Sequence, residues 1–158
     1  MVEQLAIEGA LIRQLKWRED ERGALIELYR DSWNTGRVAQ VYLTETRPGV
    51  VKAWHHHKIQ TDRFICVYGT VKLVLYDARE DSYTNDEIVE IVLSPSRNPC
   101  MVVIPPGVVH GWKCISKDTA GVVNCVSREY DGTDEYRRGP STGPAEYYDY
   151  DWNKRCDG

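Results

Sequence analysis

The sequence has no apolar run that approaches about 18 residues, which excludes a helix that spans a membrane. Its start, MVEQLAIEGALIRQLKW, has neither a long apolar stretch nor a small-residue cleavage site, so we expect no secretory signal peptide. Basic residues are not in excess either, since the formal net charge is −4, whereas a nucleic-acid binder usually carries a basic patch. We therefore expect a cytoplasmic protein that binds neither a membrane nor a nucleic acid.

Paired cysteines are also missing. The five cysteines include no CxxC pair, and their odd number does not suit a disulfide framework. Cys66 and Cys125 lie inside apolar runs, where a cysteine acts as a small buried hydrophobic residue. Free thiols of this kind are typical of a reducing compartment, which agrees with a cytoplasmic location.

The remaining pattern is that of a single domain built from strands. We expect one domain over residues 1–158, with an irregular tail rich in Tyr, Gly, Pro and Asp from about residue 131. Short β-branched and aromatic runs between turn residues predict strands at 38–44, 49–57, 63–69, 70–77, 87–93, 101–107 and 120–127. This spacing is typical of a β-sandwich or barrel. One segment differs, because the residue spacing of 18–31 (REDERGALIELYRD) predicts a short helix.

The chain holds only four histidines, and three of them stand in a row at the start of HHHKIQTD, residues 55–62. Side chains alternate between the faces of a strand, so His55 and His57 share one face and His56 points to the other. Their Cα atoms would lie roughly 6.5–7 Å apart, which lets two imidazoles converge on one ion or one substrate. The fourth, His110, follows the turn residues of IPPGVVHGW.

These two segments resemble the two sequence motifs of the cupin superfamily. Asp62 stands where the first motif usually has glutamate, and Cys114 stands where the second motif has asparagine. The resemblance implies an all-β cupin barrel, also called a jelly roll or double-stranded β-helix. The matching residues are Gly49, His55, His57, Asp62 and Gly69 in the first motif, and Pro105, Gly107 and His110 in the second.

A narrower resemblance is to the dTDP-4-dehydrorhamnose 3,5-epimerase family. It is carried by DERGALIELYR (20–30), PGVVKAWH (48–55), VYGTVKLVLYDAR (67–79) and IPPGVVHGW (104–112), in the order in which the family has them. The resemblance implies a homodimer that uses neither a metal nor another cofactor. Its substrate would be a nucleotide-linked sugar, a dTDP-4-keto-6-deoxyhexose, that loses and regains a proton next to its ketone.

The resemblance also implies roles for individual residues. A hydrogen next to a ketone becomes acidic only if the enolate is stabilised, which requires a cation or a hydrogen-bond donor. Histidine supplies a base whose pKa lies near working pH. The implied catalytic residues are the base His55 with Lys52 and His110 at the enolate, and the implied substrate-binding residues are Arg22 and Glu27 at the nucleotide, with His57 and Asp62 in the pocket.

The chain departs from the family at several of these positions. Lys52 replaces a family arginine, and Asp62 replaces a family lysine. The family tyrosine that donates the second proton falls on Val123, and Tyr130 is a conceivable substitute. The aspartate that orients the base has no clear counterpart among the tail residues Asp149, Asp151 and Asp157.

Two other functions stay open from the sequence alone. Three imidazoles and a carboxylate suit a transition-metal ion, so the chain would then be a metal-dependent cupin, an isomerase or an oxygenase. Without the second proton donor, the chain would instead be a sugar-nucleotide binding protein that has lost turnover. The metal set of the first alternative consists of His55, His57, Asp62 and His110.

Overall fold

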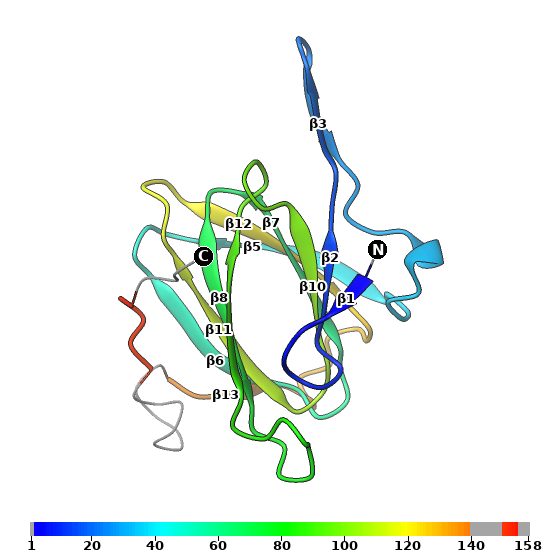
Figure 1. Ribbon diagram of the computed structural model, residues 1–158, viewed down its shortest axis with the longest axis vertical. Helices are drawn as coiled ribbons and strands as arrows, with labels where there is room; N and C mark the ends of the chain where they lie inside the picture. The colour runs from blue at the N-terminus through cyan, green and yellow to red at the C-terminus, as the bar shows by residue number, and fades with distance from the viewer. Residues whose placement is uncertain (1, 140–149, 155–158) are drawn as a thin grey trace.

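A computed structural model describes residues 2–139 and 150–154 of the chain, which form an antiparallel β structure (Figure 1). One sheet has six strands in the order β1-β2-β10-β7-β12-β5, another has five in the order β13-β6-β11-β8-β9, and β3 pairs with β4 alone. The strands are β1 (Val2–Gln4), β2 (Leu11–Gln14), β3 (Trp17–Asp20), β4 (Gly23–Ile26), β5 (Gln40–Thr46), β6 (Val51–His56), β7 (Asp62–Tyr68), β8 (Val71–Asp77), β9 (Ile88–Leu93), β10 (Cys100–Ile104), β11 (Val108–Cys114), β12 (Ala120–Val126) and β13 (Tyr136–Arg137). Within the described residues, only η1 (Asp31–Trp33) is helical, and no helix there is long and apolar enough to span a membrane.

The two large sheets face each other and enclose the main apolar core. Alternate residues of β7 point in opposite directions, so Phe64 and Cys66 join this core while Ile65 faces the outer side of the sheet. On that outer side, Ile65 packs in a second apolar cluster to which the segment after β4 contributes Leu28 and Trp33. Both faces of the central strands are therefore covered, which explains why they appear in the sequence as nearly continuous apolar runs.

The structure confirms the predicted all-β class and each of the seven predicted strands. Their ends differ from the predicted ones by no more than three residues. Six strands were not predicted, namely β1, β2, β3, β4, β11 and β13. Of these, β11 matters most, because it begins directly after the turn at Gly107 and carries His110.

The helix predicted for residues 18–31 is wrong. This segment supplies most of a two-stranded hairpin, in which β3 pairs with β4 from Trp17 opposite Ile26 to Asp20 opposite Gly23. At the turn, Gly23 has a φ of +135°, which a residue with a side chain rarely adopts and which a helix does not contain. The hairpin projects beyond the barrel as its longest extension (Figure 1).

Part of the chain after residue 131 is ordered on the barrel. β13 adds to the edge of the five-stranded sheet, with Tyr136 opposite His56 and Arg137 opposite His55. Trp152 packs against Trp54 on the outer face of that sheet, at a ring-centroid distance of 5.0 Å. The described part of the tail therefore includes a short strand and an aromatic residue packed on the barrel.

Candidate active site

A cavity of about 520 Å³ lies between the two sheets and contains most of the predicted site residues. Along β5, alternate side chains point into it, while Val41 and Leu43 point out to solvent. Its walls come from both sheets. The six-stranded sheet contributes Gln40, Tyr42, Thr44, Asp62, Phe64 and Val126, and the five-stranded sheet contributes Val51, Lys52, Ala53, His55, His110, Trp112 and Arg137.

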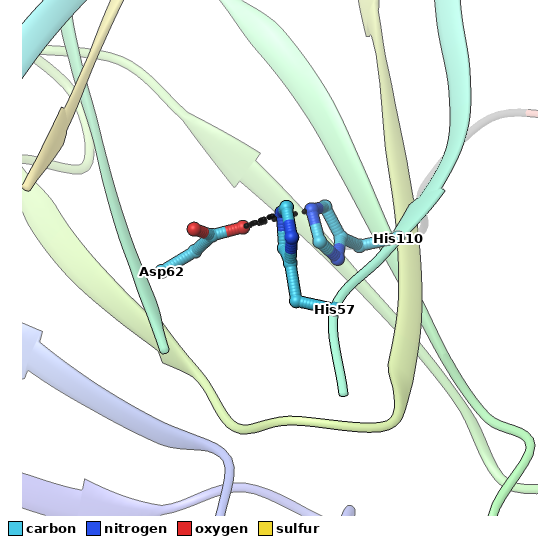
Figure 2. Close-up of side chains that lie close together, drawn as sticks. All are labelled: His57, Asp62 and His110. Atoms are coloured by element: carbon cyan, nitrogen blue, oxygen red, sulfur yellow. Dashed lines mark ion pairs between the residues drawn. The ribbon is translucent and has the colours of Figure 1, made fainter. Parts of the chain in front are cut away.

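Three of the predicted residues meet at one point of this cavity (Figure 2). The Nε2 atoms of His57 and His110 lie 3.4 and 3.2 Å from the same carboxylate oxygen, Oδ2 of Asp62. The other carboxylate oxygen of Asp62 accepts a hydrogen bond of 2.8 Å from Nε2 of Gln60. The carboxylate is thus held in place from three sides.

The second nitrogen of each of these imidazoles is also engaged. Nδ1 of His57 donates to the backbone carbonyl of Asp134, and Nδ1 of His110 donates to the carbonyl of Val108 at 3.2 Å. These carbonyl partners assign a hydrogen to Nδ1 in both rings. The two Nε2 atoms are therefore the ones that remain to serve the carboxylate or a ligand.

The protonation of Asp62 and His57 follows from their burial and their hydrogen bonds. Burial alone would raise the pKa of Asp62, but the hydrogen bonds from His110 and His57 outweigh it, and the pKa lies well below its ordinary value. Burial alone would lower the pKa of His57, but the bond to Asp62 outweighs it, and the pKa is raised. Asp62 is therefore a buried carboxylate that favours a positive charge on the neighbouring His57.

His55 lies beside this group but not in it. Its ring is 6.0 Å from that of His110 and 5.5 Å from that of Trp112. Burial lowers its pKa to about 3, and the nearby His110 and Arg137 contribute to that shift. In the described part of the chain, its buried Nδ1 has no hydrogen-bond partner. His55 is therefore neutral at physiological pH, and its pKa lies below the value near working pH that the sequence led us to expect, because the ring is buried.

Lys52 also lines the cavity, and it links the two sheets. Its Nζ donates to Oγ1 of Thr44 at 2.8 Å and to the backbone carbonyl of Glu45 at 2.6 Å, both on β5. Burial lowers the pKa of its ammonium group. Both neighbours are oxygens that keep the group in place, so Lys52 presents a fixed cation at the cavity wall.

Two predicted residues lie elsewhere in the chain. Arg22 is at the tip of the β3–β4 hairpin and pairs with Asp20 at 2.5 Å, and Glu27 just after β4 pairs with Arg30. Neither of them lines the cavity that holds His55. One chain alone does not bring Arg22 or Glu27 to its own histidines.

Three of the five residues whose roles the sequence left open have described positions. Val123 packs in the outer apolar cluster of the six-stranded sheet, so it faces away from the cavity. Tyr130 lines the cavity but is 69% exposed. Asp151 accepts a hydrogen bond from the backbone of Asn153, whereas Asp149 and Asp157 lie outside the described residues.

Several residues in and around the cavity were missed in the sequence. Gln60 positions Asp62, and the backbone carbonyl of Asp134 positions His57. The carboxylate of Asp134 also accepts hydrogen bonds from three successive backbone amides, those of residues 58–60. Tyr42 and Arg137 line the cavity itself. The alternation of QVYLT along β5 was a usable signal for Tyr42, but no pattern marks the two-residue strand that carries Arg137.

The side chains of His57, Asp62 and His110 also fit a metal ion. His57, Asp62 and His110 each offer a ligand atom, and these atoms lie within 4.8 Å of one another. Two imidazoles and a carboxylate suit divalent transition metals, and the Nδ1 bonds to carbonyls are of the kind that orient metal-binding histidines. Of the four residues in the predicted metal set, the described structure gathers these three, without His55.

Comparisons of the sequence and of the fold with known proteins agree with each other. A sequence model of the family described as dTDP-4-dehydrorhamnose 3,5-epimerase matches residues 4–139. A probable low-salt glycan biosynthesis epimerase, Agl13 of Haloferax volcanii, is 34% identical over 131 residues, which are 81% of this chain and 83% of that protein. The fold is similar to a dTDP sugar isomerase of Desulfovibrio desulfuricans G20 (TM-score 0.87, 29% identity, 94% of each chain). It is also similar to NovW, a 4-keto-6-deoxy sugar epimerase of Streptomyces spheroides (TM-score 0.85, 28% identity, 98% of this chain and 79% of that chain).

Proposed function

The chain belongs to the dTDP-4-dehydrorhamnose 3,5-epimerase family, an enzyme family, and on this premise we propose that it epimerises a dTDP-linked 4-keto-6-deoxyhexose with His55 as its base. The observation that carries the proposal is a neutral imidazole in a cavity large enough for a sugar. The description of its relative NovW as a 4-keto-6-deoxy sugar epimerase supports the same substrate class.

In the proposed reaction, His55 removes the proton from a carbon next to the ketone. The electrons of the broken C–H bond move into the ring and place negative charge on the ketone oxygen. Because an anion beside an imidazole raises its pKa, the developing enolate makes His55 a stronger base than it is in the free protein. Burial of His55 keeps it unprotonated until the substrate arrives.

The enolate is stabilised by the cations of the cavity. Lys52 supplies a positive charge that Thr44 and Glu45 hold in position. On the same wall, the imidazole of His110 is held in place by Asp62, whose Oδ2 lies 3.2 Å from its Nε2. Arg137, which pairs with Glu135, adds a second cation beside His55.

A second candidate function rests on the donor set of His57, Asp62 and His110. A divalent cation held by these residues would act as a Lewis acid at a sugar oxygen. The metal content of untagged protein purified without chelators, measured by mass spectrometry, distinguishes the metal-free epimerase from the metal-dependent enzyme. Close to one ion per chain, lost in His57→Ala, would favour the metal-dependent enzyme, whereas metal-free protein that still turns over would favour the metal-free one.

We propose that a second copy of the chain binds the nucleotide end of the substrate. Arg22 lies at the turn of the β3–β4 hairpin, which projects beyond the barrel (Figure 1). Along the edge strand β5, Val41 and Leu43 are 58% and 52% exposed, and an exposed apolar edge strand is normally covered by a partner. A homodimer that pairs at this edge would bring the hairpin of one copy, with Arg22 and Glu27, to the cavity of the other.

We assign the protein to the cytoplasm. Four cysteines in the described residues are free and buried, namely Cys66, Cys100, Cys114 and Cys125. Free thiols are typical of a reducing compartment. Burial raises the pKa of Cys66 to about 11 and that of Cys100 to about 12, so these thiols are unreactive packing residues.

The test is to incubate the protein with dTDP-4-keto-6-deoxyglucose and to follow the sugar by proton NMR. We expect signals of a sugar inverted at C3, at C5 or at both, formed by the native protein and not by His55→Asn. The matched control is His56→Asn, which changes the neighbouring histidine on the opposite face of β6 and should keep the activity. Native protein that leaves every such sugar unchanged would refute the proposal.

A further inference from the structure

We infer that Tyr42 is the acid that returns a proton to the sugar from the side opposite His55. This inference rests on the proposed function, since it concerns the second half of the same reaction. Inversion of a carbon requires that the proton leave from one face and arrive at the other, so an epimerase needs two groups on opposite sides of the ring. The fold supplies such a pair.

The two side chains come from opposite walls of one cavity. His55 lies on β6 of the five-stranded sheet, and Tyr42 lies on β5 of the six-stranded sheet. Both line the cavity of about 520 Å³ that separates these sheets. A sugar ring bound between the sheets would therefore present one face to the imidazole and the other to the phenol.

The phenol of Tyr42 is held in a way that suits a proton donor. Asn124, on the neighbouring strand β12, is fully buried, and its Nδ2 donates to the phenol oxygen at 2.9 Å. Oδ1 of Asn124 accepts from the backbone amide of Arg63, which fixes the orientation of the side-chain amide. An amide that donates to the phenol oxygen leaves the phenol hydrogen available, and it stabilises the phenolate that remains after donation.

Two further observations agree with this role. Burial, together with the charge of Asp62, raises the pKa of Tyr42 to about 12, so the phenol keeps its proton at physiological pH. Within the described residues, no acceptor takes that proton. The group is therefore protonated and uncommitted when the substrate binds.

The position of Asn124 explains why the sequence did not reveal this group. The family tyrosine was aligned with Val123, but Val123 packs on the outer face of the sheet. The next residue, Asn124, points inward, because adjacent residues of a strand face opposite sides. At this inward position the chain has an amide, and that amide holds the phenol of Tyr42 from the neighbouring strand.

Tyr130 is the alternative that the sequence suggested, and its surroundings are different. It follows β12 in a loop, it is 69% exposed, and among the described residues its phenol has no hydrogen-bond partner that would position it. A water-exposed phenol on a loop at the cavity mouth is poorly placed to deliver a proton to one face of a bound ring. Tyr42 is less exposed, at 41%, and it is held on a strand by the hydrogen bond from Asn124.

The proposed step balances in protons and electrons. His55 takes the proton, and the electrons of the C–H bond form the enolate. The O–H bond of Tyr42 then breaks, its proton adds to the other face of the same carbon, and the enolate electrons form the new C–H bond as the ketone returns. The imidazolium and the phenolate left behind exchange protons with water, which restores both groups.

The experiment measures two quantities with the same sugar in heavy water, namely deuterium entry and inversion of configuration. Native protein should show both. In Tyr42→Phe, His55 still removes the proton and can return a deuteron to the same face, so exchange should stay within about tenfold of the native rate while inversion falls about 10²- to 10⁴-fold. Tyr83→Phe, which changes an exposed tyrosine outside the cavity, is the matched control and should keep exchange and inversion, whereas Tyr130→Phe tests the alternative donor.

Each other outcome is informative. If Tyr42→Phe inverts the sugar as fast as the native protein, the inference is wrong and the proposed function stands. The inference is also wrong if Tyr42→Phe loses exchange and inversion together, or if Tyr130→Phe alone loses inversion. Native protein that neither exchanges nor inverts any such sugar would refute the proposed function, and the inference with it.

Discussion

At the scale of single residues, the cavity contains histidines of two electrostatic kinds. Asp62 is 2% exposed, and it raises the pKa of His57, whereas burial lowers the pKa of His55 to about 3. The two inward-facing histidines therefore differ in proton affinity, because of the two only His57 reaches the carboxylate. His55, which is neutral, is suited to accept a proton, whereas the surroundings of His57 favour its charged form.

Replacement of Asp62 by asparagine should destabilise the protein most near pH 6. The depressed pKa of Asp62 gives stability that is present above its unfolded value and is lost as pH falls. The raised pKa of His57 gives stability that is present below its unfolded value and is lost as pH rises through the folded one. Between these limits we expect Asp62→Asn to lower the free energy of unfolding by roughly 3 kcal/mol, as for a broken buried ion pair.

Urea unfolding at several pH values checks this expectation. The exposed Asp81 provides the control, since Asp81→Asn should leave the free energy of unfolding nearly unchanged. The difference between the native protein and Asp62→Asn should shrink on the alkaline side. A difference that is constant from acid to alkaline pH would show that the charge of Asp62 is not what stabilises the cavity.

The motif residues could be predicted, but their partners could not. His55, His57, Asp62 and His110 occur at motif spacing, and the barrel brings all four to one cavity. Tyr42 was missed because its importance depends on Asn124, which lies 82 residues away in the sequence and is its neighbour only after β5 and β12 pair. Long-range pairing of this kind leaves no local signal.

At the scale of secondary structure, glycines in tight turns set the registers that aim the cavity residues. Gly69 joins β7, which carries Asp62, to β8, and its φ is +73°. A Cβ at Gly69 would lie 2.6 Å from Cα of Ala120, a contact that the backbone of β12 cannot relieve by a side-chain rotation. Gly49, before β6, has the same φ of +73°, but a Cβ there would meet nothing within 4 Å.

These two glycines allow a matched comparison. Gly49→Ala should cost about 1 kcal/mol of unfolding free energy, from backbone strain alone. Gly69→Ala carries the same strain and an added clash, so we expect a loss of about 3 kcal/mol or more. Thermal or urea unfolding measures both, and equal losses in the two variants would contradict the role given to the contact with Ala120.

The strands were predictable where both faces are covered or where side chains alternate. The hairpin was not, because RGAL (residues 22–25), which forms the turn and the start of β4, combines charged and apolar residues at a spacing that also suits a helix. The positive φ of Gly23 and the pairing of Trp17 with Ile26 decide in favour of strands. In this segment, strand pairing overrides the local preference for a helix.

At the scale of the whole molecule, one barrel does not contain every residue that the proposed reaction uses. Arg22 lies at the turn of the hairpin, which projects from the barrel (Figure 1), and His55 lines the cavity between the two large sheets. If a second copy supplies Arg22, the two residues act in the same site only across the dimer. A mixture of two inactive variants tests this arrangement directly.

Chains with His55→Asn and chains with Arg22→Ala should each be nearly inactive alone. After mixing and subunit exchange, random pairing makes half of the dimers mixed, and one of the two sites in each has both native residues, so about a quarter of the native activity should return. The control pairs His55→Asn with Lys52→Ala, two changes in the same cavity, which should restore nothing. No recovery in the first mixture would show that Arg22 does not act in the partner's site.

The measurement that tests the proposed reaction most directly is the rate at which deuterium from heavy water enters dTDP-4-keto-6-deoxyglucose. It reports the removal of the proton next to the ketone and does not depend on the second proton donor. We expect the native protein to exchange hydrogen at C3 or C5, and His55→Asn to reduce that rate at least about 10²-fold, as the loss of a general base does. Exchange that continues at the native rate in a folded His55→Asn protein would contradict the assignment of His55 as the base.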